Sequence, residues 1–205
     1  RPQEHYLQID EAKDTFEFIE NQWFDVGGWD IRKALRLLRK SNAVLLEWLR
    51  SPIVYTQDKA FIGRLNELVP QYVQAAALLH HYRGIAGNAL KAMDLAQPIK
   101  LKKWFYVLRP LLAARWAVKQ GGIPPMTLVE LMNEWQTDCA TQITDLVALK
   151  AGQDESYLHT LSPELQKLTI DLYNEVSALS APTAEPADSG PLNELFRSTL
   201  ATIYP

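Results

Sequence analysis

The alternation of apolar and polar residues near the start of the chain predicts a short β-strand. In the segment 14–20, apolar Phe16 and Phe18 alternate with Thr15 and Glu17, which is typical of a strand with one buried face. A single strand cannot satisfy its own backbone hydrogen-bonding groups, and the rest of the chain has an almost wholly helical pattern. We therefore expect the partner strands of this segment to lie upstream of the sequence.

Beyond this strand, the apolar residues recur with the period of an α-helix. Gly27 and Gly28 are expected to form a turn, after which Leu35 and Leu38 lie on one apolar stripe. Pro98 is expected to open a long helix at its first position. Periodicity and stop signals predict helices from residue 31 and over residues 42–50, 58–68, 71–95, 98–120, 127–135, 138–151 and 163–179.

The C-terminal pattern separates a linker from a last helix. Residues 180–191 are rich in Pro, Ala and Ser and have no apolar period, which is typical of a mobile linker. Residues 192–205 carry apolar side chains at helical spacing, and we expect this tail helix to dock back on the preceding helices. The predicted fold class is therefore mainly α (α+β), a helical bundle that follows a residual strand.

Composition favours a globular protein without a membrane span. The 205 residues are 47% hydrophobic and 22% charged, which is enough to bury a core. No apolar run approaches the roughly 18 residues that cross a bilayer, and the first residues do not resemble a signal peptide. The single cysteine, Cys139, excludes an internal disulfide framework and is interpreted as a core residue. We expect a cytoplasmic protein with no membrane partner.

Charge is unevenly distributed, although the formal net charge is only −3. Residues 30–50 contain six basic and two acidic residues, whereas residues 145–194 contain nine acidic and two basic ones. The segment 98–119 has no acid; its charged and aromatic residues are Lys100, Lys102, Lys103, Trp104, Phe105, Tyr106, Arg109, Arg115, Trp116 and Lys119. Cations among aromatic rings suit a surface that binds phosphates and stacks on bases. An amphipathic core helix with a solvated basic face is an equally good interpretation of the spacing.

Two acidic residues lie on either side of the Gly-Gly pair. Asp25 stands between Phe24 and Val26, a common position for a carboxylate that shares a divalent metal, although most such acids are turn or cap residues. Asp30 stands in the first turn of the predicted helix, where an acid complements the helix dipole without any further role. The sequence contains no glycine-rich phosphate loop, serine elbow or Cys-His cluster, so hydrolase chemistry is unsupported.

Two blocks of the sequence resemble a known family. Residues 27–55, GGWDIRKALRLLRKSNAVLLEWLRSPIVY, and residues 101–116, LKKWFYVLRPLLAARW, are similar to the predicted nucleotidyltransferases of the DNA polymerase β superfamily, in the branch associated with RNA repair. The blocks occur in the order and spacing of that family, and the resemblance covers residues 6–131. It implies a transferase that moves a nucleotide from a nucleoside triphosphate (NTP), with two Mg²⁺ (or Mn²⁺) ions held by three carboxylates.

The resemblance also implies a segment that this sequence does not contain. In the family, two of the carboxylates belong to a D-x-D that follows a G-S loop, and neither motif occurs here. The family places both just before Arg1, so we expect a catalytic segment upstream of residue 1 and no activity from this chain alone. On this interpretation, residues 1–29 are the remnant of the nucleotidyltransferase α/β domain, and residues 30–179 are the helical nucleotide- or substrate-binding region.

The resemblance assigns the catalytic carboxylate and several polar positions. Asp25 best matches the third, metal-binding carboxylate, and Asp30 is the second candidate for this catalytic role. The recurring polar positions of the family are occupied by Lys33, Asn42, Glu47, Lys103, Tyr106 and Arg109. Of these, Lys33, Asn42, Lys103, Tyr106 and Arg109 are the expected contacts to the nucleotide.

The chemistry of these side chains suggests how the long basic helix would hold a nucleotide. Lys103 and Arg109 would bind phosphates, and Tyr106, one turn from each, would stack on a base or bond a phosphate. Arg115 is a further phosphate candidate. Glu47 is equally well interpreted as an internal ion-pair partner.

The predicted function is therefore metal-dependent transfer of a nucleotide to an acceptor that the residues do not specify, with RNA as one candidate. Two alternatives remain at this point. One is a non-catalytic helical module that binds a nucleotide or RNA, and the other is a protein-interaction scaffold with a mobile C-terminal arm.

Overall fold

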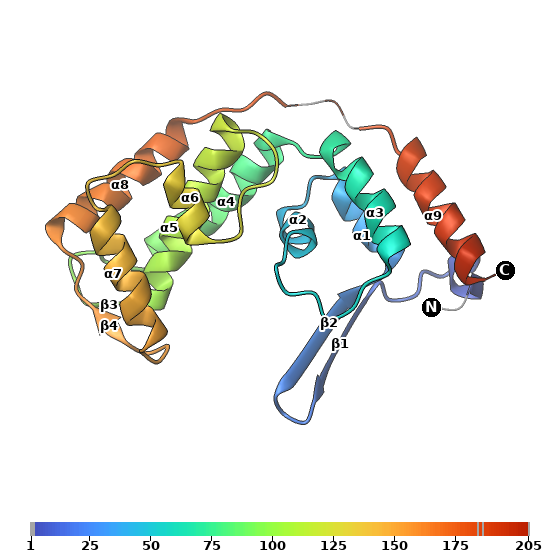
Figure 1. The fold of residues 1–205 in the computed structure, drawn as a ribbon, viewed down its shortest axis with the longest axis horizontal. Coiled ribbons are helices and arrows are strands. Elements are labelled where there is room, and N and C mark those ends of the chain that lie inside the picture. Colours follow the sequence, from blue (N-terminus) through green and yellow to red (C-terminus); the bar gives the residue numbers. More distant parts are fainter. Residues whose placement is uncertain (1–2, 184, 186, 205) are drawn as a thin grey trace. The chain divides into compact units, whose positions relative to one another are not determined.

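The computed structural model describes residues 3–183, 185 and 187–204 and divides into two compact units (Figure 1). The first unit is Arg1–Val73 with Glu185–Pro205, and the second is Gln74–Ala184. Most of the described residues are helical, with two small two-stranded sheets, which confirms the predicted fold class. The domain boundary predicted between residues 29 and 30 lies inside the first unit. None of the described helices is long and apolar enough to cross a membrane.

The first unit contains a β-hairpin near its start. β1 (Thr15–Glu20) pairs antiparallel with β2 (Phe24–Trp29). The expectation that the first strand has no partner in this chain is therefore wrong. The predicted Gly-Gly turn is also wrong, since Gly27 and Gly28 lie within β2.

The two glycines explain why the second strand was not predicted. They remove the alternation of side chains that identifies a strand in a sequence. In the hairpin, Gly28 lies opposite Phe16, and a Cβ on Gly28 would stand 2.2 Å from the tip of the Phe16 ring. The ring therefore covers the bare backbone of β2, an arrangement known to compensate for glycine in strands. Asn21, Gln22 and Trp23 connect the strands, and Asn21 and Gln22 have left-handed φ values of 54° and 65°.

The helices that follow the hairpin begin at side-chain caps. Oxygen atoms of Asp30, Asn42 and Asp58 accept hydrogen bonds from backbone N–H groups two or three residues later. The helical segments of residues 3–73 are the 3₁₀-helix η1 (Gln3–Tyr6), α1 (Ile31–Arg39), α2 (Ala43–Leu49), α3 (Lys59–Leu68) and the 3₁₀-helix η2 (Val69–Gln71).

The C-terminal helix α9 (Gly190–Ile203) completes the first unit by packing on α1 and α3 (Figure 1). Its Leu192 and Leu195 are buried. Arg64 of α3 donates a hydrogen bond to the hydroxyl of Ser198 at 2.8 Å. The expected docking of the tail helix on preceding helices is thus confirmed. In the predicted linker, residues 184 and 186 lie outside the described residues.

The second unit is organised around a pair of long helices. α4 and α5 pack along each other, and α5 also contacts α6 and α8. Its elements are α4 (Ala75–Lys91), β3 (Ile99–Lys100), α5 (Leu101–Lys119), α6 (Leu128–Asn133), α7 (Ala140–Ala151), β4 (Leu158–His159) and α8 (Pro163–Ala178). β3 and β4 form a short antiparallel ladder. Pro98 therefore precedes a strand, and the prediction that it opens α5 is wrong.

The core of the second unit includes a polar link between α5 and α8. Trp104 is fully buried, and its indole N–H donates a hydrogen bond to the buried hydroxyl of Thr169 at 3.0 Å. That hydroxyl in turn donates to the carbonyl of Leu165 at 2.7 Å. Cys139 is buried, as predicted.

Candidate nucleotide-binding surface

One side of α5 presents a cation and an aromatic ring to solvent. Lys103, Tyr106 and Arg109 are spaced three residues apart, so they lie on the same side of the helix. Tyr106 is 54% exposed, and exposed Lys103 has no hydrogen bond or ion pair with any other described residue. Arg109 is half-buried and donates from Nε to the carbonyl of Met126 at 3.1 Å. Behind these side chains, Leu108 is buried.

Other cations of α5 are paired with acids that are distant in the sequence. Lys102 forms an ion pair with Glu155. The hydrogen bond between them raises the pKa of the Lys102 ammonium and lowers the pKa of the Glu155 carboxyl. Arg115 and Lys119 both bind Glu175, at 3.0 Å and 2.6 Å. The basic segment itself contains no acid, but Glu155 and Glu175 from other parts of the chain neutralise three of its cations.

Arg115 makes contacts that a structural role explains. Its Nε binds Glu175, and its Nη1 donates to the carbonyl of Glu134 at 3.3 Å. Burial alone would raise the pKa of Glu175, but the hydrogen bonds from Lys119 and Arg115 outweigh burial and lower it. This carboxylate therefore holds two cations of α5 against α8.

Of the four aromatic residues in the basic segment, Tyr106 is the one most exposed. Trp104 is fully buried, so the expectation that it offers a flat surface to a base is wrong. Phe105 and Trp116 are half-buried. The apolar period of α5 places Trp104 on the core side, and its N–H is already satisfied by Thr169.

The two candidate carboxylates lie at opposite ends of β2. Asp25 is exposed, lies opposite Ile19 and has no hydrogen bond or ion pair within the described chain. Asp30 caps α1 by accepting from the backbone N–H of Arg32 at 2.9 Å, and it also accepts from the Tyr6 hydroxyl at 2.7 Å. Five residues of extended chain separate the two acids by about 16 Å, so they cannot share one ion.

Two further predicted contacts have structural partners in the first unit. Lys33 donates to the carboxylate of Asp14 at 2.9 Å, and this hydrogen bond lowers the pKa of Asp14. The side-chain oxygen of Asn42 accepts from the backbone N–H of Leu45 at 3.1 Å and caps α2. Glu47 is half-buried on α2.

The described residues do not assemble a metal site by themselves. Among them, no group of three His, Cys, Asp or Glu side chains is placed to hold an ion. Asp25 offers the carboxylate oxygens that Mg²⁺ prefers, so it could supply one of the several ligands that the ion needs.

The structure also brings together residues that the sequence did not single out. Arg32, Arg36 and Arg39 of α1 line a groove with α9. Their spacing of four and three residues is visible in the sequence, but it predicts only a solvated basic face of a helix. The second wall of the groove comes from α9, more than a hundred positions later in the chain. The sequence pattern does not indicate that α9 packs against this face of α1.

Comparison with known proteins identifies the family. A model of the RNA repair pathway DNA polymerase beta family (RlaP) matches residues 1–198. The chain belongs to this family. A relative, the uncharacterized protein YcgL of Bacillus subtilis (strain 168), is 33% identical over 98% of this chain and 79% of its own length. No solved structure matches the chain. Membership of the RNA repair pathway DNA polymerase beta family confirms the resemblance carried by residues 27–55 and 101–116.

Proposed function

We propose that this chain takes part in transferring a nucleotide from an NTP to an RNA acceptor, as a polymerase β-like nucleotidyltransferase. Membership of the RNA repair pathway DNA polymerase beta family supports the class of reaction. The observation that carries the proposal is the exposed pair Lys103 and Tyr106 on α5. Lys103 forms no ion pair with another described side chain, and the Tyr106 ring is 54% exposed, with the Lys102 ammonium 5.9 Å from its centre.

The proposed roles follow from the chemistry of each side chain. The Lys103 ammonium binds a phosphate as a point charge, and the Tyr106 ring stacks on the base. Arg109, oriented by the Met126 carbonyl, contributes a positioned guanidinium. Arg115 is less suited, because Glu175 already occupies it. Mg²⁺, when bound, neutralises charge on the departing pyrophosphate, and Asp25 would be one of its ligands.

Nucleotide binding tests the surface on α5. Titration of the chain with a fluorescent ATP analogue is expected to give about tenfold weaker binding for Lys103→Ala, because an ion-assisted hydrogen bond to phosphate is lost. Lys91→Ala is the matched control, since Lys91 is an exposed lysine in the last turn of α4. Equal affinity of Lys103→Ala and the unsubstituted chain would remove Lys103 from the site.

Transfer activity tests Asp25. With labelled ATP, Mg²⁺ and an RNA acceptor, Asp25→Asn is expected to reduce transfer by the protein at least about tenfold, because a proposed metal ligand is lost. Glu20→Gln is the control, because Glu20 is also exposed but lies on the other face of the hairpin, opposite Phe24. Unchanged metal-dependent transfer by Asp25→Asn would exclude Asp25 from the mechanism.

A further inference from the structure

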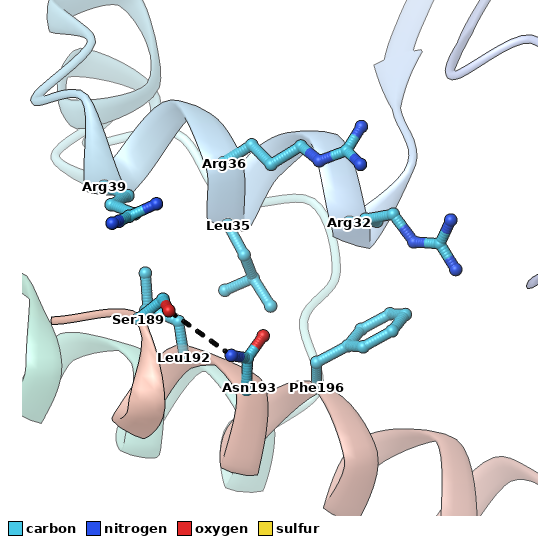
Figure 2. A pocket seen from close by; sticks show the side chains of 8 residues that line it. All are labelled: Arg32, Leu35, Arg36, Arg39, Ser189, Leu192, Asn193 and Phe196. Atoms are coloured by element: carbon cyan, nitrogen blue, oxygen red, sulfur yellow. Dashed lines mark hydrogen bonds between the residues drawn. The ribbon is translucent and has the colours of Figure 1, made fainter.

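A groove of about 330 Å³ runs between α1 and α9 in the first unit (Figure 2). Its lining contains three arginines and no acidic residue. The lining residues are Arg32, Leu35, Arg36 and Arg39 on the α1 side and Ser189, Leu192, Asn193 and Phe196 on the α9 side. Such a concentration of one charge at an open groove attracts anions although the chain carries a net negative charge.

The three arginines form a row along α1. Positions 32, 36 and 39 lie on one side of the helix and extend over about 10 Å. Arg36 has a weak pair with Glu11 at 3.5 Å, in which both side chains are mostly exposed and screened by water. Arg39 donates from Nε to the carbonyl of Ala187 at 3.0 Å, which uses one of its five N–H donors. Both guanidinium groups therefore keep N–H donors that the described chain does not use.

Arg32 is more firmly held at one end of the row. Its Nη2 donates to the carbonyl of Tyr6 at 3.1 Å, and its guanidinium lies over the rings of Tyr6 and Phe196 at 5.0 Å and 5.5 Å. The position of this charge is thus fixed before any ligand binds, which lowers the cost of ordering it.

The opposite wall adds neutral polar groups and a ring. Asn193 donates from its amide to the hydroxyl of Ser189 at 3.4 Å, and both side chains point from α9 toward α1, with Leu35 and Arg39 across from them (Figure 2). Leu35 and Leu192 are buried between the two helices beneath them. The combination of a cation row, an amide, a hydroxyl and an aromatic edge is that of a track for a sugar-phosphate chain.

We propose that this groove binds the phosphodiester backbone of single-stranded RNA, with successive phosphates at Arg32, Arg36 and Arg39. A row of cations about 10 Å long fits an extended polyanion better than one compact phosphate group. The choice of RNA rests on the proposed function, whereas the anion-binding character rests on the groove alone. The groove shares no residue with the α5 surface, because it consists entirely of residues of the first unit.

Fluorescence anisotropy with a labelled RNA oligonucleotide tests the groove in the full chain. Removing two phosphate contacts with Arg36→Gln and Arg39→Gln together is expected to lower the salt slope of log K by about 1.4 and the affinity by roughly 25-fold at about 0.1 M salt. Arg197→Gln is the matched control, because Arg197 is an exposed arginine on α9 that does not line the groove. A salt slope in the double variant equal to that of the control would overturn the proposal, as would no binding of RNA at low salt.

A second variant leaves every arginine in place. Asn193→Asp introduces a carboxylate among the guanidinium groups near the start of α9, where the helix dipole tolerates an acid. It is expected to weaken RNA binding while circular dichroism and thermal unfolding remain unchanged. Unchanged RNA affinity in a folded Asn193→Asp protein would contradict the assignment.

Competition distinguishes the ligand classes. RNA is expected to displace the labelled oligonucleotide, whereas inorganic triphosphate and poly-glutamate at matched charge are not. Equal displacement by triphosphate or by poly-glutamate would overturn the assignment to an RNA strand. ATP binding at Lys103 should be unaffected by the groove variants, so failure of the groove and failure of the proposed function are separately observable.

Discussion

The Trp104 indole N–H has one protein acceptor, the hydroxyl of Thr169, at a site without access to water. Thr169→Val keeps the shape of the side chain but leaves the buried donor unsatisfied, so we expect a loss of about 1–3 kcal/mol in the free energy of unfolding. Urea denaturation monitored by tryptophan fluorescence measures this loss.

Thr169→Ser is the matched control for this hydrogen bond. Serine keeps the hydroxyl and loses one methyl group, so it should cost about 1 kcal/mol, mainly through lost packing. A Thr169→Val protein as stable as Thr169→Ser would show that the hydrogen bond contributes little.

The hairpin turn offers a residue-scale prediction of the opposite sign. Gln22 adopts a φ of 65°, which is strained for a side chain with a Cβ and natural for glycine. Gln22→Gly is expected to stabilise the hairpin by about 0.5–1 kcal/mol, seen as slower amide exchange in β1 and β2. Unchanged amide exchange in Gln22→Gly would contradict this prediction, because it would mean that Gln22 is not strained at this position.

At the scale of elements, Glu175 joins α8 to two cations of α5. Its folded pKa is lowered, so its stabilisation is complete above the ordinary carboxyl pKa of 4.5 and is lost as the pH falls through the folded value. Glu175→Gln should therefore cost about 0.5–1 kcal/mol at neutral pH, a modest figure because the pair is partly solvated. The difference should vanish in acid.

Urea unfolding at a series of pH values measures this linkage. Asp145→Asn is the control, because Asp145 is an exposed acid on α7 without a partner among the described residues. A destabilisation by Glu175→Gln that stays constant from neutral to acidic pH would mean that the lost interaction is packing rather than charge.

The helices could be predicted because their signals are local. Caps at Asp30, Asn42 and Asp58 stand next to the segments that they start, and the apolar period of α5 is continuous from Leu101 onward. β2 was not predicted because its glycines carry no alternation. The two-residue strands β3 and β4 are too short for any period to appear.

The candidate site was harder to predict because charge pairing is not local. The sequence identified Lys103 and Tyr106, which are exposed, but it gave no indication that Glu155 and Glu175 neutralise other cations of α5. An ion pair between residues fifty positions apart depends on how helices pack. The acid-free segment therefore predicted a more cationic surface than the folded chain presents.

At the scale of the whole molecule, the family could be recognised from the two sequence blocks, whereas the arginine groove could not. The groove needs α9 placed against α1, and the intervening chain gives no periodic signal that couples these helices. The family match covers residues 1–198 and therefore includes most of α9. It does not indicate which surface of the chain α9 packs against.

The apolar face of the hairpin affects how this protein behaves in solution. Phe16, Phe18 and Phe24 lie on one face of the strands and are each at least half exposed. Attraction between such faces grows with temperature and with sulfate, whereas the proposed binding of RNA in the groove would weaken as salt rises. We expect light scattering of concentrated protein to increase on warming in sulfate and to fall in Phe18→Thr. Cool buffers of low salt concentration should therefore favour both a monodisperse protein and the proposed binding of RNA. A series of sulfate concentrations would separate the two effects, because self-association through the hairpin face should increase with sulfate whereas RNA binding should decrease.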